Sequence, residues 1–386
     1  MSADFSFTVT KTDGRARRGR LRLPHGEIET PVFMPVGTRA AVKGLTHDQL
    51  IALDPAIILG NTYHLHLRPG DDLIARAGGL HAFMGWERPI LTDSGGYQVF
   101  SLSGQRTITE EGAAFRSHID GRACLFTPES AVDIQQRLGS DVAMIFDECA
   151  PWPADRDVVE RAMERTLRWA RRGRDRFLAL RGAAVPDVPR ATPGQAQFGI
   201  IQGGTHLDLR DRSVAGTVAV GFEAYAIGGL SVGEPVDLMY DVVAHTADQL
   251  PADRPRYLMG TGMPDDLVEC VARGIDMFDC VLPTRNARNG QLLTRHGIIS
   301  IKNARYAEDL RPPDPECECP TCRRHSRAYL RHLYMVGEMT AATLNTVHNL
   351  HFYLDTMRAI RKAIEFGIFN QFRQEFQRTF TRRQVP

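Results

Sequence analysis

The chain has 386 residues, of which 43% are hydrophobic and 24% are charged, and its net charge at neutral pH is +1. No apolar stretch approaches the roughly 20 residues of a membrane span, which excludes a membrane-spanning protein. The N-terminus lacks the basic and then apolar layout of a signal peptide, so we expect a cytoplasmic protein.

Eight short apolar runs follow one another along the chain. They cover residues 32–36, 57–60, 89–92, 142–146, 198–201, 224–227, 256–260 and 275–278. Several are followed directly by a carboxylate, an amide or a glycine, namely by Asp93, Asp147, Gln202, Gly228 and Asp279. A short apolar run that ends in this way is typical of a buried parallel strand whose C-terminal end carries functional groups.

The segments between these runs have the pattern of helices. Helices are predicted at residues 128–138, 155–180, 208–220 and 237–250. Eight strands that alternate with helices predict an α/β fold, the (β/α)8 TIM barrel, whose active site lies at the C-terminal ends of the strands. A doubly wound open sheet is the alternative, and it would leave the same residues at the strand ends.

The chain is longer than the roughly 250 residues of a bare barrel, so additional segments are expected. We expect one catalytic barrel domain over residues 1–386, with additional N-terminal strands over about residues 1–30. A zinc-binding insertion is expected over about residues 304–350, closed by a C-terminal helix over about residues 350–378.

Three cysteines lie close together near the C-terminus. Cys317, Cys319 and Cys322 have the spacing Cys-x-Cys-x2-Cys, and a turn at Pro320 lets all three face one ion. A closed tetrahedral site needs a fourth ligand, for which His348 is the candidate. The alternatives to it are His325, His332 and His351. Three clustered thiols cannot all pair in disulfides with one another, so the pattern predicts one structural Zn²⁺ per subunit.

Basic residues gather in two segments although the net charge is close to zero. One segment covers residues 11–22 and the other covers residues 285–311. Such clusters can contact phosphates, and solvated arginines on helix and hairpin surfaces are the alternative. The second segment begins shortly after Asp279 and so lies at the mouth of the predicted pocket.

Two carboxylates at well-separated strand ends, Asp93 and Asp279, indicate the chemistry of this pocket. One can attack while the other handles a proton, as in retaining glycosidases. An aspartate that only caps the next helix is the alternative for any single position. A Cys149 nucleophile is a weaker alternative, because no neighbouring strand end supplies a histidine.

The other strand ends offer groups that suit a heterocyclic base. Asp147, Gln202 and the backbone of Gly229 and Leu230 provide hydrogen-bond donors and acceptors for the edge of a ring. Cys149 lines the same pocket. The side chains of Tyr97 and Met259 are flat or soft enough to cover the two faces of such a ring.

Longer sequence blocks surround these residues. They are residues 91–99 (LTDSGGYQV), 146–149 (FDEC), 201–204 (IQGG), 225–234 (YAIGGLSVGE) and 277–290 (MFDCVLPTRNARNG). Together with the cysteine motif and His348, these blocks resemble the bacterial tRNA-guanine transglycosylase (queuine tRNA-ribosyltransferase) family. The resemblance runs in order from about Phe5 to the C-terminus.

The resemblance implies a role for each matching residue. It implies that Asp279 is the nucleophile and Asp93 the general acid/base, and that Zn²⁺ is bound by Cys317, Cys319, Cys322 and His348. The positions that match base recognition are Ser94, Gly95, Gly96, Tyr97, Asp147, Gln202 and Gly229. The positions that match RNA contacts are Gly260, Thr261, Gly262, Met263, Pro264, Asp265, Asp266, Thr284, Arg285, Asn286, Ala287 and Arg288.

The implied reaction exchanges guanine at the anticodon wobble position of GUN tRNAs for 7-aminomethyl-7-deazaguanine (preQ1), through a covalent aspartyl-ribosyl RNA intermediate, in queuosine biosynthesis. It uses no redox or nucleotide cofactor, and the family implies a homodimer. Cys149 and Val232 resemble the members that use preQ1 rather than queuine. Met263 and Val347 depart from the family, since relatives often place Lys and Glu there.

Other classes of protein remain alternatives. A non-catalytic, zinc-stabilised tRNA-binding protein would need only the basic segments and the metal site, whereas this chain also has Asp93 and Asp279. A catalytically silent partner subunit would be expected to lose such residues. A dinucleotide-binding oxidoreductase is disfavoured because no glycine fingerprint is complete.

Overall fold

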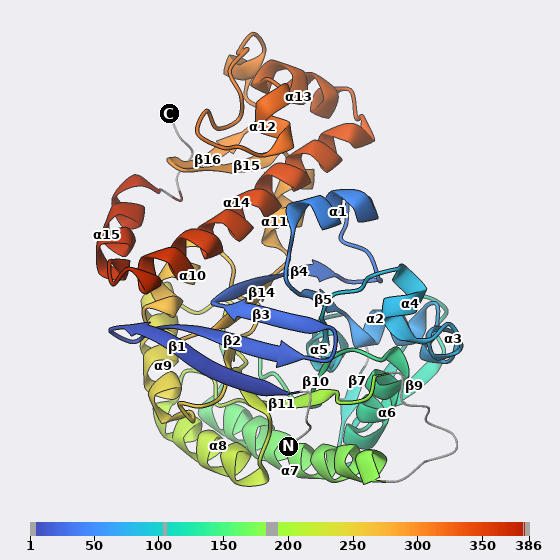
Figure 1. The fold of residues 1–386 in the computed structure, drawn as a ribbon. Coiled ribbons are helices and arrows are strands. Elements are labelled where there is room, and N and C mark those ends of the chain that lie inside the picture. The colour runs from blue at the N-terminus through green and yellow to red at the C-terminus, as the bar shows by residue number, and fades with distance from the viewer. Residues whose placement is uncertain (1–4, 103–105, 183–191, 381, 383–386) are drawn as a thin grey trace.

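The computed structural model describes residues 5–102, 106–182, 192–380 and 382. Within this part of the chain, eight parallel strands close into a barrel, and the last of them pairs with the first (Figure 1). In barrel order they are β4 (Val32–Gly37), β5 (Ile58–Gly60), β6 (Ile90–Thr92), β10 (Val142–Met144), β11 (Ala196–Ile201), β12 (Ala224–Ile227), β13 (Arg256–Leu258) and β14 (Met277–Cys280). The TIM-barrel prediction is confirmed. The doubly wound alternative is wrong, because this sheet has no open edge.

Each predicted apolar run forms one barrel strand. Every residue of β4 and of β11 is buried, because helices cover the outside of the sheet and side chains fill its inside. Asp93 follows β6 and Gln202 follows β11, as expected, whereas β14 extends two residues further than the apolar run and includes Asp279. The polar residues therefore gather at the C-terminal end of the barrel.

The helices around the barrel lie where the sequence pattern predicts them. The four predicted helices are α6 (Pro128–Leu138), α7 (Arg156–Gly182), α8 (Leu207–Val220) and α9 (Val236–Gln249). Thr127 caps the start of α6 with a capping box, and Gly139 ends it in the left-handed conformation at φ 68°. Shorter helices are α1 (His47–Leu53), α2 (Thr62–Leu67), α3 (Asp71–Arg76), α4 (Gly79–Met84), α5 (Gly96–Leu102), α10 (Pro264–Val271) and α11 (Leu282–Arg288).

An antiparallel sheet covers the N-terminal end of the barrel. It consists of β1 (Ser6–Asp13), β2 (Ala16–Leu23) and β3 (Gly26–Thr30). Arg17 of β2 binds Asp276, the residue before β14, and His25 in the β2–β3 turn binds Asp141, the residue before β10. These contacts join the additional strands to the ends of barrel strands that are opposite the predicted pocket.

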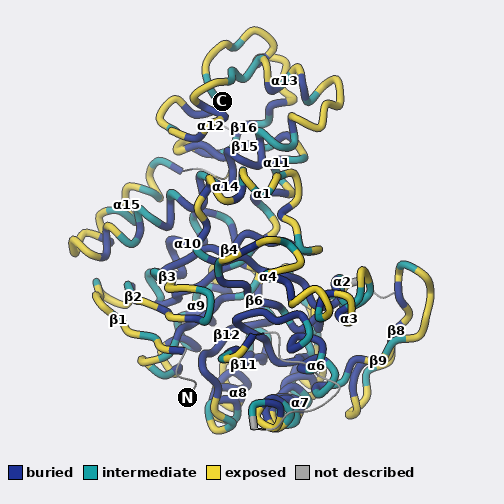
Figure 2. The backbone as a smooth tube through the Cα atoms, turned by 45° about the vertical axis from the view of Figure 1, so that its right-hand side comes forward, coloured by how far each residue is buried: buried dark blue, intermediate teal, exposed yellow. Residues whose placement is uncertain are grey.

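A second antiparallel sheet follows α5, and the sequence pattern does not predict it. Its strands are β7 (Arg106–Ile108), β8 (Ala113–Arg116) and β9 (Ala123–Phe126). All three are short, and most of their residues are exposed or half-buried. They therefore lack the apolar runs that mark the barrel strands (Figure 2).

The C-terminal part of the chain lies above the barrel in Figure 1. Its elements are β15 (Gln291–Thr294), β16 (Gly297–Ser300), η1 (Ala304–Tyr306), α12 (Pro320–Arg324), α13 (Arg327–Met335), α14 (Met339–Glu365) and α15 (Phe369–Thr379). The segment expected as one helix over about residues 350–378 consists of the second half of α14 and of α15. Gly367, at φ 68°, lies in the turn between them.

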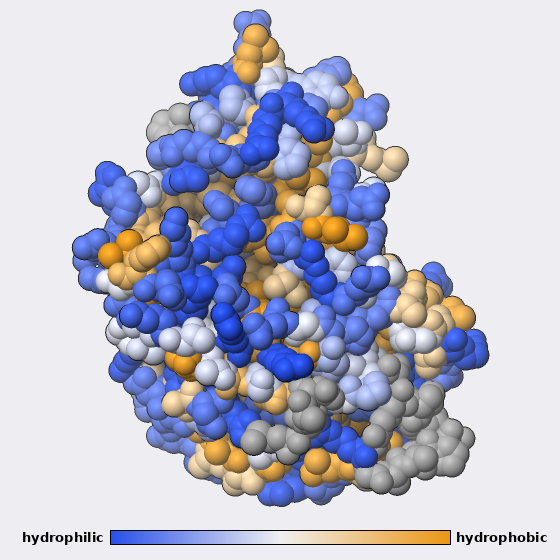
Figure 3. Space-filling model, viewed as in Figure 1, coloured by the Kyte–Doolittle hydropathy of each residue, from blue (hydrophilic) through white to orange (hydrophobic). Residues whose placement is uncertain are grey.

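No helix in the described ranges is long and apolar enough to cross a membrane. On the face shown in Figure 3, hydrophilic residues predominate and hydrophobic ones form small separate areas.

Candidate active site

Asp93 lies at the end of β6 and is held by hydrogen-bond donors without charge. Its Oδ2 accepts hydrogen bonds from the Asn61 amide at 2.5 Å and the Gln98 amide at 3.1 Å. Its Oδ1 accepts from the N–H groups of Thr62 at 3.0 Å and Gly95 at 3.2 Å. Burial raises the pKa of Asp93 to about 7, opposed by the Thr62 N–H and assisted by the charge of Asp279. A carboxyl group with this pKa can both donate and accept a proton near neutral pH.

Asp279 is close enough for its charge to act on Asp93, and no cation among the described residues pairs with it. Its Oδ1 accepts hydrogen bonds from the Tyr257 hydroxyl and from the Gly260 N–H, the latter at 2.9 Å. Burial raises the pKa of this carboxyl group, and these two donors oppose the rise. Its Oδ2 has no donor among the residues that the structure describes, so that oxygen is available to attack an electrophile.

Asp147 joins Gln202 and Ser94, from two other strand ends, into one polar surface, called the recognition surface here after its predicted role. It accepts hydrogen bonds from the Gln202 amide at 2.7 Å and from the Ser94 hydroxyl at 3.3 Å. Burial raises its pKa to about 6. Two positions beside this surface favour glycine. A Cβ on Gly96 would lie 2.7 Å from the Asp147 carbonyl oxygen, and one on Gly229 would lie 2.3 Å from Gln202 Oε1.

The remaining residues predicted to bind the base lie around this surface. Tyr97 on α5 is 54% exposed, Met259 is half-buried and Leu230 is buried. Burial and the nearby charge of Asp147 raise the pKa of the Cys149 thiol to about 12. Since a thiolate is the reactive form, this disfavours the Cys149 nucleophile.

The two segments predicted to contact RNA are exposed to different degrees. Gly260 and Arg285 are exposed, and Met263, Asn286 and Arg288 are half-buried. The buried members are Thr261, Gly262, Pro264, Asp266, Thr284 and Ala287, and Asp265 and Asp266 form ion pairs with Arg382. RNA binding by these segments stays a prediction.

Three residues of the site were missed in the sequence. Asn61 directly follows the run that forms β5, so the same rule of polar strand ends could have identified it. Glu234 accepts hydrogen bonds from the N–H groups of Ser231 and Val232 and so shapes the loop after β12. Tyr257 lies inside β13, where no local signal distinguishes it from a core aromatic residue.

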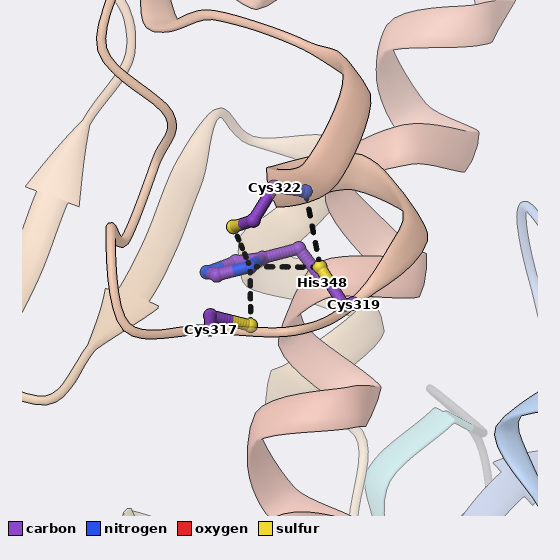
Figure 4. Close-up of side chains that lie close together, drawn as sticks. All are labelled: Cys317, Cys319, Cys322 and His348. Carbon is purple, nitrogen blue, oxygen red and sulfur yellow. Dashed lines mark hydrogen bonds between the residues drawn. The ribbon is translucent and has the colours of Figure 1, made fainter.

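The four predicted metal ligands lie together at the start of α12 and on α14 (Figure 4). Nδ1 of His348 is 3.7 Å from the sulfur of Cys317, 3.5 Å from that of Cys319 and 3.2 Å from that of Cys322. Bond lengths of about 2.3 Å to sulfur and 2.05 Å to nitrogen place these atoms about 3.5 Å apart in a tetrahedral site. The cluster can therefore hold a metal ion, with His348 rather than the other three histidines as the fourth ligand.

The second nitrogen of His348 completes this arrangement. Its Nε2 lies 2.7 Å from the Leu293 carbonyl oxygen, to which it can only donate. This contact holds the proton on Nε2 and leaves the lone pair of Nδ1 directed at the three sulfurs. The imidazole is fully buried, so packing and this hydrogen bond together hold its orientation.

The chain matches the protein family described as queuine tRNA-ribosyltransferase over residues 12–382. It is similar to proteins of that name from several bacteria. The protein from Caldanaerobacter subterraneus subsp. tengcongensis is 56% identical over 376 residues, which cover 97% of each chain. The one from Nitrosomonas europaea is 56% identical over 370 residues, 96% of each chain. One from a Shewanella species is 53% identical over 380 residues, 98% of each chain.

Proposed function

This chain belongs to the queuine tRNA-ribosyltransferase family, and we propose that it exchanges guanine at the anticodon wobble position of GUN tRNAs for preQ1, a step toward queuosine. It is a pentosyltransferase of the tRNA-guanine transglycosylase type. The observation that carries the finer proposal is the pair of uncompensated carboxylates, Asp93 and Asp279, beside the Asp147–Gln202 recognition surface. We expect the reaction to take place in the cytoplasm.

The first half of the reaction forms a covalent RNA intermediate. Oδ2 of Asp279 attacks the anomeric carbon of the wobble ribose, and the bond to the base breaks with its electron pair on guanine. Asp93 in its acid form donates a proton to the departing guanine, which a pKa near 7 allows. The ribose is then joined to Asp279 through an ester bond, and no phosphodiester bond is cut.

The second half reverses these roles. The carboxylate of Asp93 accepts the ring N–H proton of incoming preQ1, whose nitrogen attacks the same carbon. The ester bond breaks and Asp279 is restored as a carboxylate. Each displacement inverts the carbon, so the two together preserve the β configuration of the nucleoside.

The recognition surface suits the edge of guanine and of preQ1. Asp147 accepts hydrogen bonds from the ring N–H and amino group, while the Gln202 amide and the Gly229 N–H face the carbonyl side. Ser94, Gly95 and Gly96 shape the turn around Asp147, and Tyr97 and Met259 cover the ring faces. The Leu230 carbonyl oxygen accepts from the aminomethyl group of preQ1, near Cys149.

The RNA must present an unstacked base to this pocket. An anticodon loop is single-stranded, so turning the wobble nucleotide out costs only a few kcal/mol, roughly the cost of unstacking one base. Two segments border the strand end that carries Asp279: the residues after β13 and those of α11. Both segments contact the RNA backbone and neighbouring bases, α11 with Arg285 and Arg288 among its residues. Relatives often place Lys at position 263. The Met263 side chain is shorter and uncharged, so its contact with the RNA is shorter in reach and lacks a charge.

The metal in this proposal is structural zinc. Four protein ligands fill a tetrahedral shell, which leaves no position for a substrate. Its contribution is to hold α12 against α14 and thereby to stabilise the C-terminal part of the chain.

We further propose a homodimer formed through the C-terminal part. Large apolar side chains are exposed on α1, α13 and the start of α14, and α1 lies beside α14 in Figures 1 and 2. They are Ile51, Tyr329, Met335, Val336 and Met339. Val347 is buried and uncharged, so the ion pair between subunits that a Glu could form at this position in some relatives is not expected here. Light scattering should give about twice the chain mass of 43.0 kDa.

The deciding experiment is incubation of the protein with a GUN-anticodon tRNA and labelled guanine. Label should enter the RNA, and addition of preQ1 should displace it. A tRNA whose wobble guanosine is replaced by adenosine is the matched control and should take up no label. Binding of tRNA without any incorporation would contradict the proposal and favour a non-catalytic tRNA-binding protein.

A further inference from the structure

Arg210 is a fully buried cation that forms no ion pair within the described part of the chain. It lies in the first half of α8, and its side chain has no exposed surface. Among the described residues, no carboxylate forms an ion pair with it, although other buried arginines such as Arg17 and Arg174 each have one. Burial lowers the pKa of Arg210 to about 10, opposed by the nearby Cys149 and Glu234, so the side chain is still charged at neutral pH. An unpaired buried charge is costly and therefore calls for a functional reason.

The guanidinium group joins the ends of two barrel strands. It donates to the carbonyl oxygen of Ile201, the last residue of β11, at 2.7 Å, and to that of Gly228, just after β12, at 2.9 Å. It also donates to the Gly204 carbonyl oxygen at 2.9 Å. The residues that follow Ile201 and Gly228 are Gln202 and Gly229, the two that face the carbonyl side of the base in the proposed function.

The contact with Gly228 determines where the next N–H points. In a trans peptide the carbonyl oxygen and the following N–H point in opposite directions. Since the Gly228 oxygen is turned toward Arg210, the Gly229 N–H is turned away from it. That N–H has no acceptor within the described part of the chain, and Gly229 has φ 67°, which favours glycine.

The charge of Arg210 also makes that N–H a stronger donor. A hydrogen bond from a cation to a peptide oxygen polarises the whole peptide group and strengthens the bond that its N–H makes. When the bond between ribose and base breaks, the electron pair on the purine spreads to its carbonyl oxygen. A fixed positive charge behind the N–H stabilises this oxygen most when the base departs.

We propose that Arg210 is a positioning residue for the base: it orients and polarises the Gly228–Gly229 peptide so that the Gly229 N–H binds the purine carbonyl oxygen. This proposal rests on the proposed function, because it assumes a guanine-type base in the pocket. It adds a residue that touches neither RNA nor base and acts only through the backbone.

The test compares two competitors of labelled guanine, namely unlabelled guanine and 2-aminopurine, which lacks the carbonyl oxygen and the ring N–H next to it. Asp147, which accepts from that N–H, is the same in every variant compared, so a change in the ratio between variants reports on the carbonyl contact. In Arg210→Met the preference for guanine over 2-aminopurine should fall by about tenfold, because only guanine has the carbonyl oxygen that the Gly229 N–H binds. Arg210→Lys keeps the charge in a similar volume but cannot reach three carbonyl groups. It should fold and show a smaller fall in the same ratio.

The matched control is Arg174→Met, which removes a buried arginine from the opposite end of the barrel, where it pairs with Glu223. It should lower the melting temperature and leave the ratio unchanged. If folded Arg210 variants bind both competitors more weakly by the same factor, the role of Arg210 is purely structural and the proposal is wrong. If the unaltered protein incorporates no guanine at all, the proposed function fails instead.

Discussion

Strand β14 carries a carboxylate at each end, and the surroundings of the two are opposite. Asp276, just before the strand, binds the guanidinium of Arg17 and accepts from the Arg256 N–H at 2.8 Å. Asp279, near the other end, accepts from the Tyr257 hydroxyl and one N–H, both neutral donors. Asp276 is fully buried and Asp279 is half-buried, yet only the first has a counter-charge.

Strand β10 repeats this contrast. Asp141 precedes it, and although burial would raise its pKa, hydrogen bonds from His25 at 2.8 Å and His81 at 3.1 Å hold that pKa well below its usual range. Asp147, beyond the other end, meets only the neutral Gln202 and one hydroxyl group, and burial raises its pKa to about 6. In a TIM barrel the N-terminal end serves stability and the C-terminal end serves chemistry, and here each end has the electrostatics for its task.

If the C-terminal end is built for reactivity, Asp279→Asn should remove activity without removing stability. The amide keeps the size of the side chain but cannot attack, so exchange should fall by about a thousandfold or more and no covalent RNA should form. Denaturing gels of the protein with labelled tRNA measure the adduct, and tRNA binding serves as the control. An adduct in normal yield would refute the role of Asp279.

The metal cluster should behave like the N-terminal end, as a stabilising element. Cys319→Ser should lower the zinc content from one per chain and lower the stability by several kcal/mol, about what a structural zinc contributes to local folding. Metal analysis and thermal unfolding of the same samples test this. Loss of zinc with full stability and full activity would contradict a structural role.

Asp276→Asn should have the reverse effect of Asp279→Asn. It leaves Arg17 buried without a counter-charge, which should cost about 3 to 5 kcal/mol in the free energy of unfolding. Urea unfolding measures this loss. The exchange rate per folded molecule should stay unchanged at temperatures well below the melting point, and a selective loss of rate would mean that the two ends are not separate in function.

The dependence of stability on pH should have opposite signs for Asp93, at the C-terminal end, and Asp141, at the N-terminal end. The pKa of Asp93 is raised from 3.8 to about 7, so the folded protein keeps a proton that the unfolded chain releases, and stability falls as pH rises through this window. The pKa of Asp141 is lowered, so its contribution is fully present above about pH 4 and is lost as pH falls below that.

Two substitutions make this difference measurable. At pH 7.5, Asp93→Asn should be more stable than the unaltered protein by about 1 kcal/mol, less than the full shift implies because the side chain is partly exposed. The gain should shrink toward pH 5. Asp141→Asn should be less stable than the unaltered protein at both pH values. A gain from Asp93→Asn that does not depend on pH would exclude the ionisation of Asp93 as its cause.

The smallest effect is expected in the loop after β12, where the C-terminal end sets specificity rather than rate. Val232 borders a small cleft with Gly229 and Glu234, next to the recognition surface. Queuine carries a bulky cyclopentenediol that Val232 should obstruct, so Val232→Gly should narrow the preference for preQ1 by about tenfold, or roughly 1 kcal/mol. Competition between the two bases measures this. Equal use of queuine by the unaltered protein would show that Val232 does not set the choice.

The sequence predicts the barrel well because its strands are buried on both sides. Each reads as an uninterrupted apolar run, and the polar residue that ends it marks the functional end. The short strands β7, β8 and β9 escape this rule because their side chains are largely exposed. The break between α14 and α15 escapes it as well, since the residues on both sides continue a helical pattern.

The sequence predicts those parts of the site that depend on the type of a single residue. It does not predict properties that depend on neighbours distant in the sequence. Asp93 and Asp279 stand out as carboxylates after apolar runs, but burial raises the pKa of both. The pKa of Asp93 is raised further by Asp279, 186 positions along the chain, and no local pattern contains these effects. The spacing of residues in the sequence is compatible with four histidines as the fourth metal ligand. The structure identifies His348, because α14 lies beside α12 and brings this histidine next to the three cysteines. Arg210 reads in the sequence as an ordinary arginine on a helix surface.

The position of Asp276 and Asp279 on one strand has a consequence for engineering. Three residues of extended chain span about 10 Å, so the ion pair at the bottom sets how high the proposed nucleophile stands in the barrel. Loops at the mouth can be exchanged to admit other bases, because they do not alter this height. An insertion or deletion within β14 would displace the nucleophile by a whole step, so a redesigned enzyme should retain this strand and its Arg17 anchor unchanged.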